Sequence, residues 1–360
     1  MTARDPIEAA LAPRSAFSLE EIVEVSGRIR AAVEGIIEGK PEVVKLAVSV
    51  LLAEGHLLIE DVPGVGKTML AKTLARAIDC TVRRVQFTPD LLPSDITGVS
   101  VFDQERREFD FKPGAIFANI VVGDEINRAS PKTQSALLEC MEERQVTVDG
   151  TTYLLESPFM VIATQNPIEM EGTYPLPEAQ RDRFMAMISM GYPSADAELA
   201  MLDHHGRTSP LEDLEAVADA REVAKVIEAV REIYVSDAVR RYVIDLAAAT
   251  RASPDLRLGA SPRATLQLVR AARAWAALDD RDYVLPDDIQ ALALHVLPHR
   301  LLPTAEAQIG RRATTEIVAD LLARVPVPDA VPDAATGGPP VLTGRRRAPS
   351  GGARDRRPGR

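Results

Sequence analysis

The stretch "LLIEDVPGVGKTMLAKTLA", residues 57–75, places a Gly-Lys-Thr between an apolar run and an amphipathic run. A loop of the form G-x-x-x-x-G-K-[ST] in this setting binds phosphates through backbone N–H groups at the start of a helix. Here the first position is Asp61 instead of glycine. The stretch therefore indicates a nucleotide site with one unusual residue. The alternative is a chance Gly-Lys-Thr in a loop.

Each part of this loop has a role that follows from its residue type. Gly64 and Gly66 let the backbone turn so that successive N–H groups face an anion. Lys67 supplies positive charge for the β and γ phosphates, and Thr68 supplies a hydroxyl for Mg²⁺. The residues predicted to surround the nucleotide phosphates are Pro63, Gly64, Val65, Gly66, Lys67, Thr68 and Met69.

Asp61 has to turn the chain where a glycine normally would. Aspartate tolerates left-handed backbone geometry and can accept hydrogen bonds from N–H groups that follow it. Its carboxylate cannot point at the phosphates, because like charges at short range repel each other. We therefore expect the Asp61 side chain to face away from the nucleotide and to fasten the loop from outside.

A second element carries two adjacent acids. "NIVVGDE", residues 119–125, is an apolar strand that ends in Asp124 and Glu125, the form of a Walker B motif. Asp124 is expected to hold Mg²⁺ with Thr68, and Glu125 to orient or deprotonate the attacking water. Ligands of open α/β sheets bind at the carboxyl ends of strands, where both acids lie. Two solvated acids at a strand end are the alternative.

Short apolar runs alternate with helical stretches, which predicts a parallel sheet covered by helices on both faces. Two further stretches, 101–117 and 144–157, indicate β-hairpins inserted into this alternation, the second turning at Asp149-Gly150. The five predicted strands are "HLLIE" (56–60), "TVRRVQF" (81–87), "NIVVGDE" (119–125), "FMVIATQNP" (159–167) and "RFMAMISM" (183–190).

From about residue 195 the pattern changes to amphipathic helices opened by Ser, Asp or Pro, which predicts an all-helical second domain. The predicted organisation is a flexible N-terminus (1–16), an α/β domain (17–194), a helical domain (195–325) and a disordered tail (326–360) rich in Arg, Gly and Pro.

Charge and composition narrow the class of protein. The 360-residue chain carries a net charge of −11 and the tail from Val331 carries +5, which leaves −16 for residues 1–330. An acidic body argues against tight duplex binding, although the tail offers a basic segment for RNA, an acidic partner or a membrane surface. Two cysteines, no apolar run of spanning length and a start without a signal-peptide core lead us to expect a cytoplasmic protein without a transmembrane segment.

Several long motifs together resemble the MoxR family of AAA+ ATPases. They are "IEDVPGVGKT", "DEINRASPKTQSALLECMEE", "VIATQNPIEMEGTYPLPEAQRDRF" and "LGASPRATLQLVRAARAWA", and the resemblance covers about residues 17–325. It implies a P-loop AAA+ core with a five-stranded parallel sheet, helix-2 and pre-sensor hairpin insertions, and a helical lid. It also implies ATP and Mg²⁺ as cofactors, and a homo-oligomeric ring, expected to be a hexamer. An aspartate at the first loop position is familiar in this family.

The resemblance assigns three further residues. Asn166 resembles the sensor that positions the lytic water, with a buried strand cap as the alternative. Arg183 in "RDRF" resembles the arginine finger that serves the ATP of a neighbouring subunit, with Arg181 as the other candidate because relatives more often carry an apolar residue there. Arg263 in "SPRA" resembles the second sensor, which contacts the γ-phosphate of its own subunit. A surface arginine in a first helical turn is the alternative.

By this resemblance the chain is expected to be a ring-forming ATPase that remodels a protein, inserts a metal or cofactor, or assembles complexes with a von Willebrand A-domain partner. One alternative is a nucleotide-gated binding switch with little turnover, although Glu125 and Arg183 would be superfluous in it. Another is a motor stimulated by nucleic acid. Apart from the arginine-rich tail, no basic groove or zinc-ligand cluster in the sequence supports a nucleic-acid partner.

Overall fold

The computed structural model describes residues 18–328, except for residues 63, 167–172, 193–194, 196–197 and 200–209. The predicted flexible N-terminus lies outside the described residues, as does nearly all of the predicted tail. The predicted domain boundary at 194/195 lies at the edge of the segment 193–209, most of which is also outside them.

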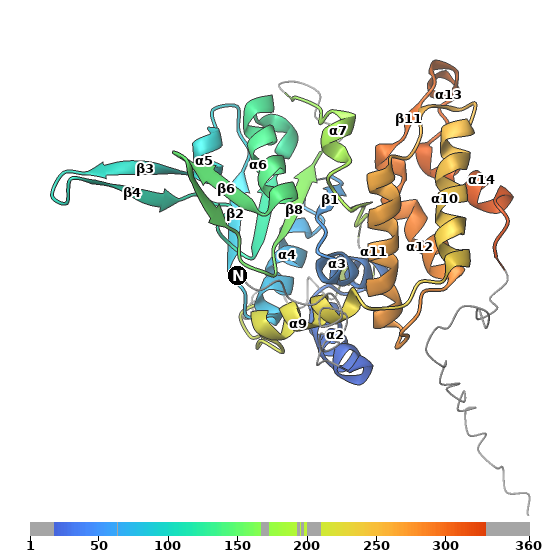
Figure 1. Cartoon of the computed structure of the whole chain (residues 1–360), viewed down its shortest axis with the longest axis horizontal. Coiled ribbons are helices and arrows are strands. Elements are labelled where there is room, and N and C mark those ends of the chain that lie inside the picture. Colours follow the sequence, from blue (N-terminus) through green and yellow to red (C-terminus); the bar gives the residue numbers. More distant parts are fainter. Residues whose placement is uncertain are drawn as a thin grey trace, which may run out of the picture. The chain divides into compact units, whose positions relative to one another are not determined.

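The five predicted strands form one parallel sheet with the order β2-β5-β8-β1-β9 (Figure 1). Their bounds are β1 Leu57–Glu60, β2 Val82–Gln86, β5 Ile120–Asp124, β8 Met160–Gln165 and β9 Ala186–Ile188. The prediction of a helix-covered parallel sheet is confirmed. All five strands run the same way, so their carboxyl ends meet at one edge of the sheet and their amino ends at the other.

Both faces of the three central strands β1, β5 and β8 are buried, because their alternate side chains enter two different hydrophobic clusters. One cluster takes Leu57, Ile59, Ile120, Val122, Met160 and Ile162, together with helices α2 (Leu19–Glu34), α3 (Pro41–Leu52) and α4 (Lys67–Ala77). The other takes Leu58, Val121, Val161 and Ala163, together with helix α6 (Pro131–Glu143). This double burial explains why the strands are continuous apolar runs in the sequence.

The two hairpins lie outside the main sheet. The first pairs β3 (Gly98–Asp103) with β4 (Glu108–Pro113) and projects from the body, while the second pairs β6 (Gln145–Val148) with β7 (Thr151–Leu154) (Figure 1). Phe111 of the first stacks on Tyr153 of the second with ring centroids 4.0 Å apart. The prediction of two inserted hairpins is confirmed, with the first strand beginning three residues earlier than expected.

The C-terminal region consists mainly of helices, among them five that carry its packing. They are α9 (Ala220–Val230), α10 (Asp237–Ala252), α11 (Pro262–Leu278), α12 (Pro286–Val296) and α14 (Thr314–Arg324), and the short elements α13 (Ala305–Ile309) and η2 (Pro298–Arg300) accompany them. The prediction that this region is entirely helical is wrong in one detail. Strands β10 (Leu256–Leu258) and β11 (Leu302–Pro303) pair antiparallel and place Leu256 in the core.

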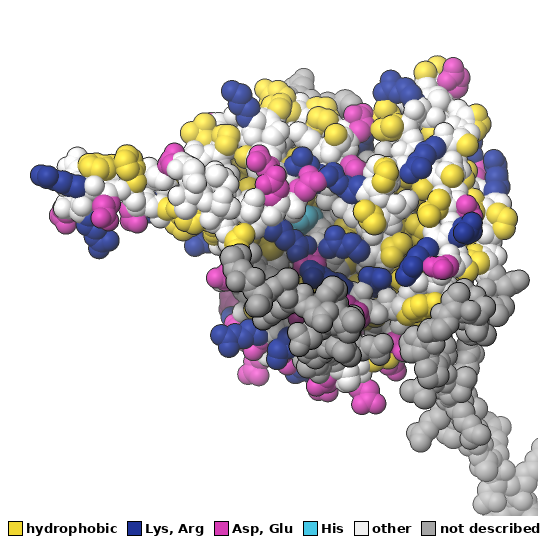
Figure 2. Space-filling view, in the orientation of Figure 1, with side chains coloured by type: hydrophobic (Ala, Val, Ile, Leu, Met, Phe, Trp, Pro, Cys, Tyr) yellow, Lys and Arg dark blue, Asp and Glu magenta, His cyan; other side chains and the backbone are white. Residues whose placement is uncertain are grey.

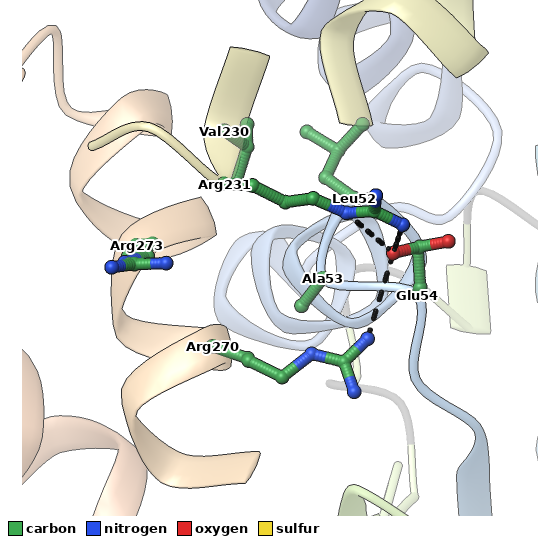
Figure 3. Close-up of a pocket in the computed structure, with 7 residues that line it drawn as sticks. All are labelled: Leu52, Ala53, Glu54, Val230, Arg231, Arg270 and Arg273. Carbon is green, nitrogen blue, oxygen red and sulfur yellow. Dashed lines mark hydrogen bonds and ion pairs between the residues drawn. The ribbon is translucent and has the colours of Figure 1, made fainter. Parts of the chain in front are cut away.

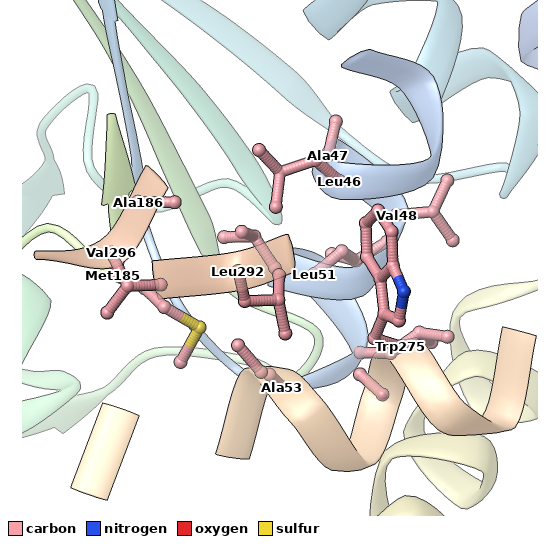
Figure 4. Packing of buried hydrophobic residues seen from close by; sticks show 14 of the residues in the cluster. Leu46, Ala47, Val48, Leu51, Ala53, Met185, Ala186, Trp275, Leu292 and Val296 are labelled. Carbon is pink, nitrogen blue, oxygen red and sulfur yellow. The ribbon is translucent and has the colours of Figure 1, made fainter. Parts of the chain in front are cut away.

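The helical region shares its core with the sheet (Figure 4). Trp275 of α11 and Leu292 of α12 belong to the same buried cluster as Leu51 of α3 and Ala186 of β9. The buried ammonium group of Lys45 of α3 lies 3.8 Å from the centre of the Trp275 ring and donates to Asp279, just after α11, at 2.7 Å. Helix α11 therefore packs against the sheet and α3 through this shared core.

The carboxylate of Glu54, in the turn between α3 and β1, forms ion pairs with arginines from three other parts of the chain. Glu54 is paired with Arg144 before β6. It is also paired with Arg231 after α9 and with Arg270 of α11 (Figure 3). Its side chain is 8% exposed and lines a small pocket that is partly open to solvent. Burial alone would raise the pKa of Glu54, but the hydrogen bonds from Arg231 and Arg144 outweigh burial and hold that pKa below its ordinary value.

We expect Glu54→Gln to lower the free energy of unfolding near neutral pH by about 2 kcal/mol, because charge-assisted hydrogen bonds from Arg144 and Arg231 and the ion pair with Arg270 are lost. The folded-state pKa of Glu54 is lowered, so its contribution is complete above the ordinary carboxyl pKa of about 4.3 and is lost as the pH falls through the lower folded value. Urea unfolding of both proteins between pH 8 and pH 4 measures this. The exposed Glu24→Gln serves as the control, and an equal effect of both substitutions would contradict the prediction.

Candidate active site

The phosphate-binding loop has the backbone geometry of an anion site. Gly64 and Gly66 have φ angles of 87° and 89°, in the left-handed region that favours glycine, and helix α4 begins directly afterwards at Lys67. No side chain crowds either glycine, so the backbone angle and not the space excludes a larger residue. Pro63 lies outside the described residues. The loop thus presents backbone N–H groups at a helix N-terminus.

Asp61 fastens the loop from outside, and the prediction that its side chain faces away from the phosphates is confirmed. One carboxylate oxygen accepts hydrogen bonds from Ser189 Oγ (3.0 Å) and from the backbone N–H of Gly191 (2.7 Å), both just beyond β9. The other accepts the N–H of Val62 (2.9 Å). Asp61 itself does not adopt a positive φ, and the left-handed turns fall on the two glycines. The carboxylate therefore links the loop to its neighbouring strand.

Lys67 lies where the loop closes on itself. Its ammonium group donates to the backbone oxygen of Asp61 at 2.7 Å. Partial burial lowers the pKa of Lys67, while the charges of Asp61, Asp124 and Glu125 act in the opposite direction. Met69, in the same first turn of α4, has an apolar side chain without a hydrogen-bond donor, so any hydrogen bond that it gives to a phosphate has to come from its backbone N–H.

The carboxylate of Asp124 contacts side chains from the phosphate-binding loop and from the two strands beside β5. Thr68 Oγ1 lies 3.4 Å from Asp124 Oδ2, and Thr164 of β8 donates to Oδ1 at 3.3 Å. Arg84 of β2 places its Nε 2.6 Å from Oδ2. The predicted pairing of Thr68 with Asp124 is thus found in the structure, together with a cationic neighbour that we did not predict.

Glu125 follows in a left-handed conformation, with φ at 57°. Its backbone N–H donates to Thr164 Oγ1, and its Oε2 accepts from Gln86 Nε2 and Arg128 Nη1, both at 2.8 Å. Arg84 and Gln86 are alternate residues of β2 and share one face of it, and the register pairs Gln86 with Asp124. Their alternation is visible in the sequence, but the strand order that brings them beside the acids is not.

Asn166 completes this edge. It directly follows Gln165, the last residue of β8, whose backbone oxygen accepts the N–H of Asp61 at 3.3 Å. Asn166 is buried and lies at the same carboxyl edge as the loop and the two acids. The structure therefore gathers Lys67, Thr68, Asp124, Glu125 and Asn166 at one edge of the sheet.

Arg183 lies at the opposite edge. Two residues later, the N–H of Met185 donates to the backbone oxygen of His56, just before the amino end of β1. The four residues of β1 separate this edge from the phosphate-binding loop by about 13 Å of strand. Arg183 Nε lies 3.2 Å from Glu142 Oε2, in the last turn of α6. Arg181 ends α7 (Glu178–Arg181), and its buried Nε has no hydrogen-bond partner among the described residues.

Arg263 also lies at this opposite edge, and the expectation that it contacts the γ-phosphate of its own chain does not agree with its position. Its terminal nitrogens pair with Glu142 Oε1 and, at 3.8 Å, with Asp182 Oδ2. The physical reason is the anchoring of α11. Its capping residue Ser261 donates to Asp182, and the buried Arg300 holds Asp182 with an Nε–Oδ1 distance of 2.9 Å.

Known proteins match this architecture over most of its length. The model for the ATPase family associated with various cellular activities (AAA) matches residues 56–186, and the model for the AAA lid domain matches residues 248–321. A crystal structure of a protein from Cytophaga hutchinsonii, assigned as an ATPase, superposes with a TM-score of 0.80 at 36% identity and covers 86% of this chain and 97% of its own.

Three similar proteins cover nearly their full lengths. YeaC of Bacillus subtilis is 47% identical over 86% of this chain and 97% of its own. Chaperone MoxR1 of Mycobacterium tuberculosis is 41% identical over 92% and 90%, and MoxR of Paracoccus denitrificans is 32% identical over 83% and 95%. With the sheet, the phosphate-binding loop and the paired acids in place, these matches establish that the chain belongs to the MoxR family of AAA+ ATPases.

Proposed function

We propose that this chain is a Mg²⁺-dependent ATP hydrolase whose active site is completed by a second copy of the chain. One observation carries the proposal: the loop and both acids lie at the carboxyl edge of the sheet, whereas Arg183 lies at the amino edge. A guanidinium at the amino edge cannot reach the phosphates of its own loop across about 13 Å of strand. A head-to-tail contact that repeats and closes forms a ring, for which the family suggests a hexamer.

The residues of the carboxyl edge fit ATP and Mg²⁺. The two left-handed glycines and Lys67 offer N–H groups and charge to the phosphates. Thr68 and Asp124 offer only oxygen atoms as ligands, which Mg²⁺ prefers. Arg84 already places a positive charge beside Asp124 Oδ2, the carboxylate oxygen that faces Thr68. When bound, Mg²⁺ would neutralise charge that develops on the phosphoryl oxygens.

Glu125 is the residue that we assign to the attacking water. Both described hydrogen bonds to its carboxylate use Oε2, which leaves Oε1 to accept a proton from the water or to orient it. The buried Asn166 at the end of β8 would supply the second contact to this water. Arg183 of the neighbouring copy would spread negative charge away from the transferred phosphoryl group.

For the cellular role we propose chaperone-like remodelling of a protein, with insertion of a metal or cofactor or assembly of a complex as its outcome. The support is the chaperone designation of the 41% identical Mycobacterium tuberculosis protein. A von Willebrand A-domain partner and a cytoplasmic location belong to this proposal through the family. None of the helices in the described part combines the length and apolarity needed to cross a bilayer.

Two substitutions separate binding from hydrolysis. We expect Lys67→Ala to lower ATP affinity by at least about 100-fold, because a charge-assisted partner of the phosphates is removed. We expect Glu125→Gln to keep that affinity and to lower the hydrolysis rate by about 10²–10⁴-fold, because the proton acceptor is lost. Binding of a fluorescent ATP analogue and release of phosphate measure the two effects. Weak binding by Glu125→Gln would contradict the assignment.

The arginine finger is tested by mixing two inactive proteins. Arg183→Ala should bind ATP normally and hydrolyse it about 10³–10⁵ times more slowly. Lys67→Ala cannot bind ATP but keeps Arg183, so adding it to Arg183→Ala should restore hydrolysis at the mixed interfaces. Arg181→Ala is the matched control and should stay active. A mixture that remains inactive would refute a site shared between two copies.

A further inference from the structure

We infer that Glu142 is a positioning residue that holds Arg183 for the neighbouring copy, and that Arg263 acts on the finger through Glu142 instead of touching ATP. This inference rests on the proposed function of Arg183. Its starting point is a chain of ion pairs in which one carboxylate joins the lid to the finger. Glu142 Oε1 contacts Arg263 of α11, and Glu142 Oε2 contacts Arg183 Nε at 3.2 Å.

The contact between Arg183 and Glu142 is compatible with a role for Arg183 as an arginine finger. Its charged contact among the described residues uses Nε, which leaves both terminal nitrogens for a partner outside the chain. A guanidinium presents five N–H donors in a rigid plane, so a carboxylate fixed at Nε orients the remaining four. The side chains of Arg183 and Glu142 are 29% and 40% exposed, so a neighbour can approach them.

Arg263, in contrast to Arg183, is bound through its terminal nitrogens. Both of its terminal nitrogens face carboxylates of its own chain, Glu142 and Asp182. These are the nitrogens that a sensor would direct at a γ-phosphate. Arg263 is therefore placed to fix Glu142, and its position in the first turn of α11 connects the finger to the helical region.

Asp182, the residue that precedes Arg183, is also fixed in position by hydrogen bonds. Asp182 accepts hydrogen bonds from Ser261, the capping residue of α11, and from Arg300, whose side chain is 1% exposed. A rotation of α11 would therefore move both Arg263 and the backbone at 182–183. Figure 2 shows Lys and Arg side chains gathered on the surface between α6 and α11, on a body that is otherwise acidic. This surface suits the phosphates of a nucleotide held by a second copy.

The test uses Glu142→Gln in the full chain. A loosened finger should lower kcat by about 10–100-fold, the order expected for a small misplacement of a catalytic group, while ATP affinity stays within about twofold. Because Glu142 acts on the neighbour's ATP, adding Lys67→Ala should restore hydrolysis to Glu142→Gln. A substitution that damaged its own subunit would not be rescued in this way. The exposed Glu139→Gln, one turn earlier on α6, is the control and should resemble the wild type.

Arg263→Ala separates the two roles considered for this arginine. If it acts through Glu142, the variant keeps its ATP affinity, is rescued by Lys67→Ala, and gives no further loss when combined with Glu142→Gln. Weakened ATP binding without rescue would overturn the inference. So would a Glu142→Gln protein that is fully active, faster than the wild type, or slow without rescue.

Failure of this inference differs from failure of the proposed function. Rescue of Arg183→Ala by Lys67→Ala, together with an unaffected Glu142→Gln, would remove only the role of Glu142. The absence of rescue for Arg183→Ala would remove the shared active site itself.

Discussion

A parallel sheet has two chemically different edges, and the function of this protein depends on that constraint. The strand order β2-β5-β8-β1-β9 brings the carboxyl ends of β1, β5 and β8 together, so the loop, the acid pair and Asn166 become neighbours. The same parallel arrangement sends the segment before β9 to the other edge, and Arg183 lies there. Under the proposed function, one chain therefore carries both halves of an active site and keeps them apart.

The amino edge is organised by shared carboxylates. Glu54, Glu142 and Asp182 each bind guanidinium groups from elements that are distant in the sequence. Arginine suits this task because its planar group can serve two partners at once. The lid helix α11 contributes Arg263 and Arg270, two turns apart on the same face, to two of these clusters. A change in the lid would therefore reach the edge that we propose meets the next copy.

Much of this architecture was predictable. Burial on both faces forces the central strands β1, β5 and β8 to be largely apolar runs, so their positions were evident, and the loop and the acid pair are local patterns. Repulsion by phosphates was enough to orient Asp61 away from them. A Cβ added at Gly123 of β5 would lie 3.1 Å from the Phe87 ring, a tight contact that depends on the tertiary fold.

The features that were missed depend on which elements lie side by side. Arg84 and Gln86 reach the acids only because β2 pairs with β5, and strand order is not a local property of the sequence. The start of α11 was recognisable from Ser261 and Pro262, but a helix start does not reveal which edge it faces. The position of Arg263 followed from Asp182 and Arg300, which lie far apart along the chain. The pair β10–β11 is too short to show periodicity.

The central claim is that ATP hydrolysis requires two copies of the chain. It is tested most directly by measuring the hydrolysis rate per chain across a range of protein concentrations, with sedimentation velocity on the same samples to give the assembled fraction. The account predicts a rate per chain that rises in proportion to the assembled fraction and approaches zero for isolated chains. A rate per chain that stays the same when the chains are fully dissociated would contradict it.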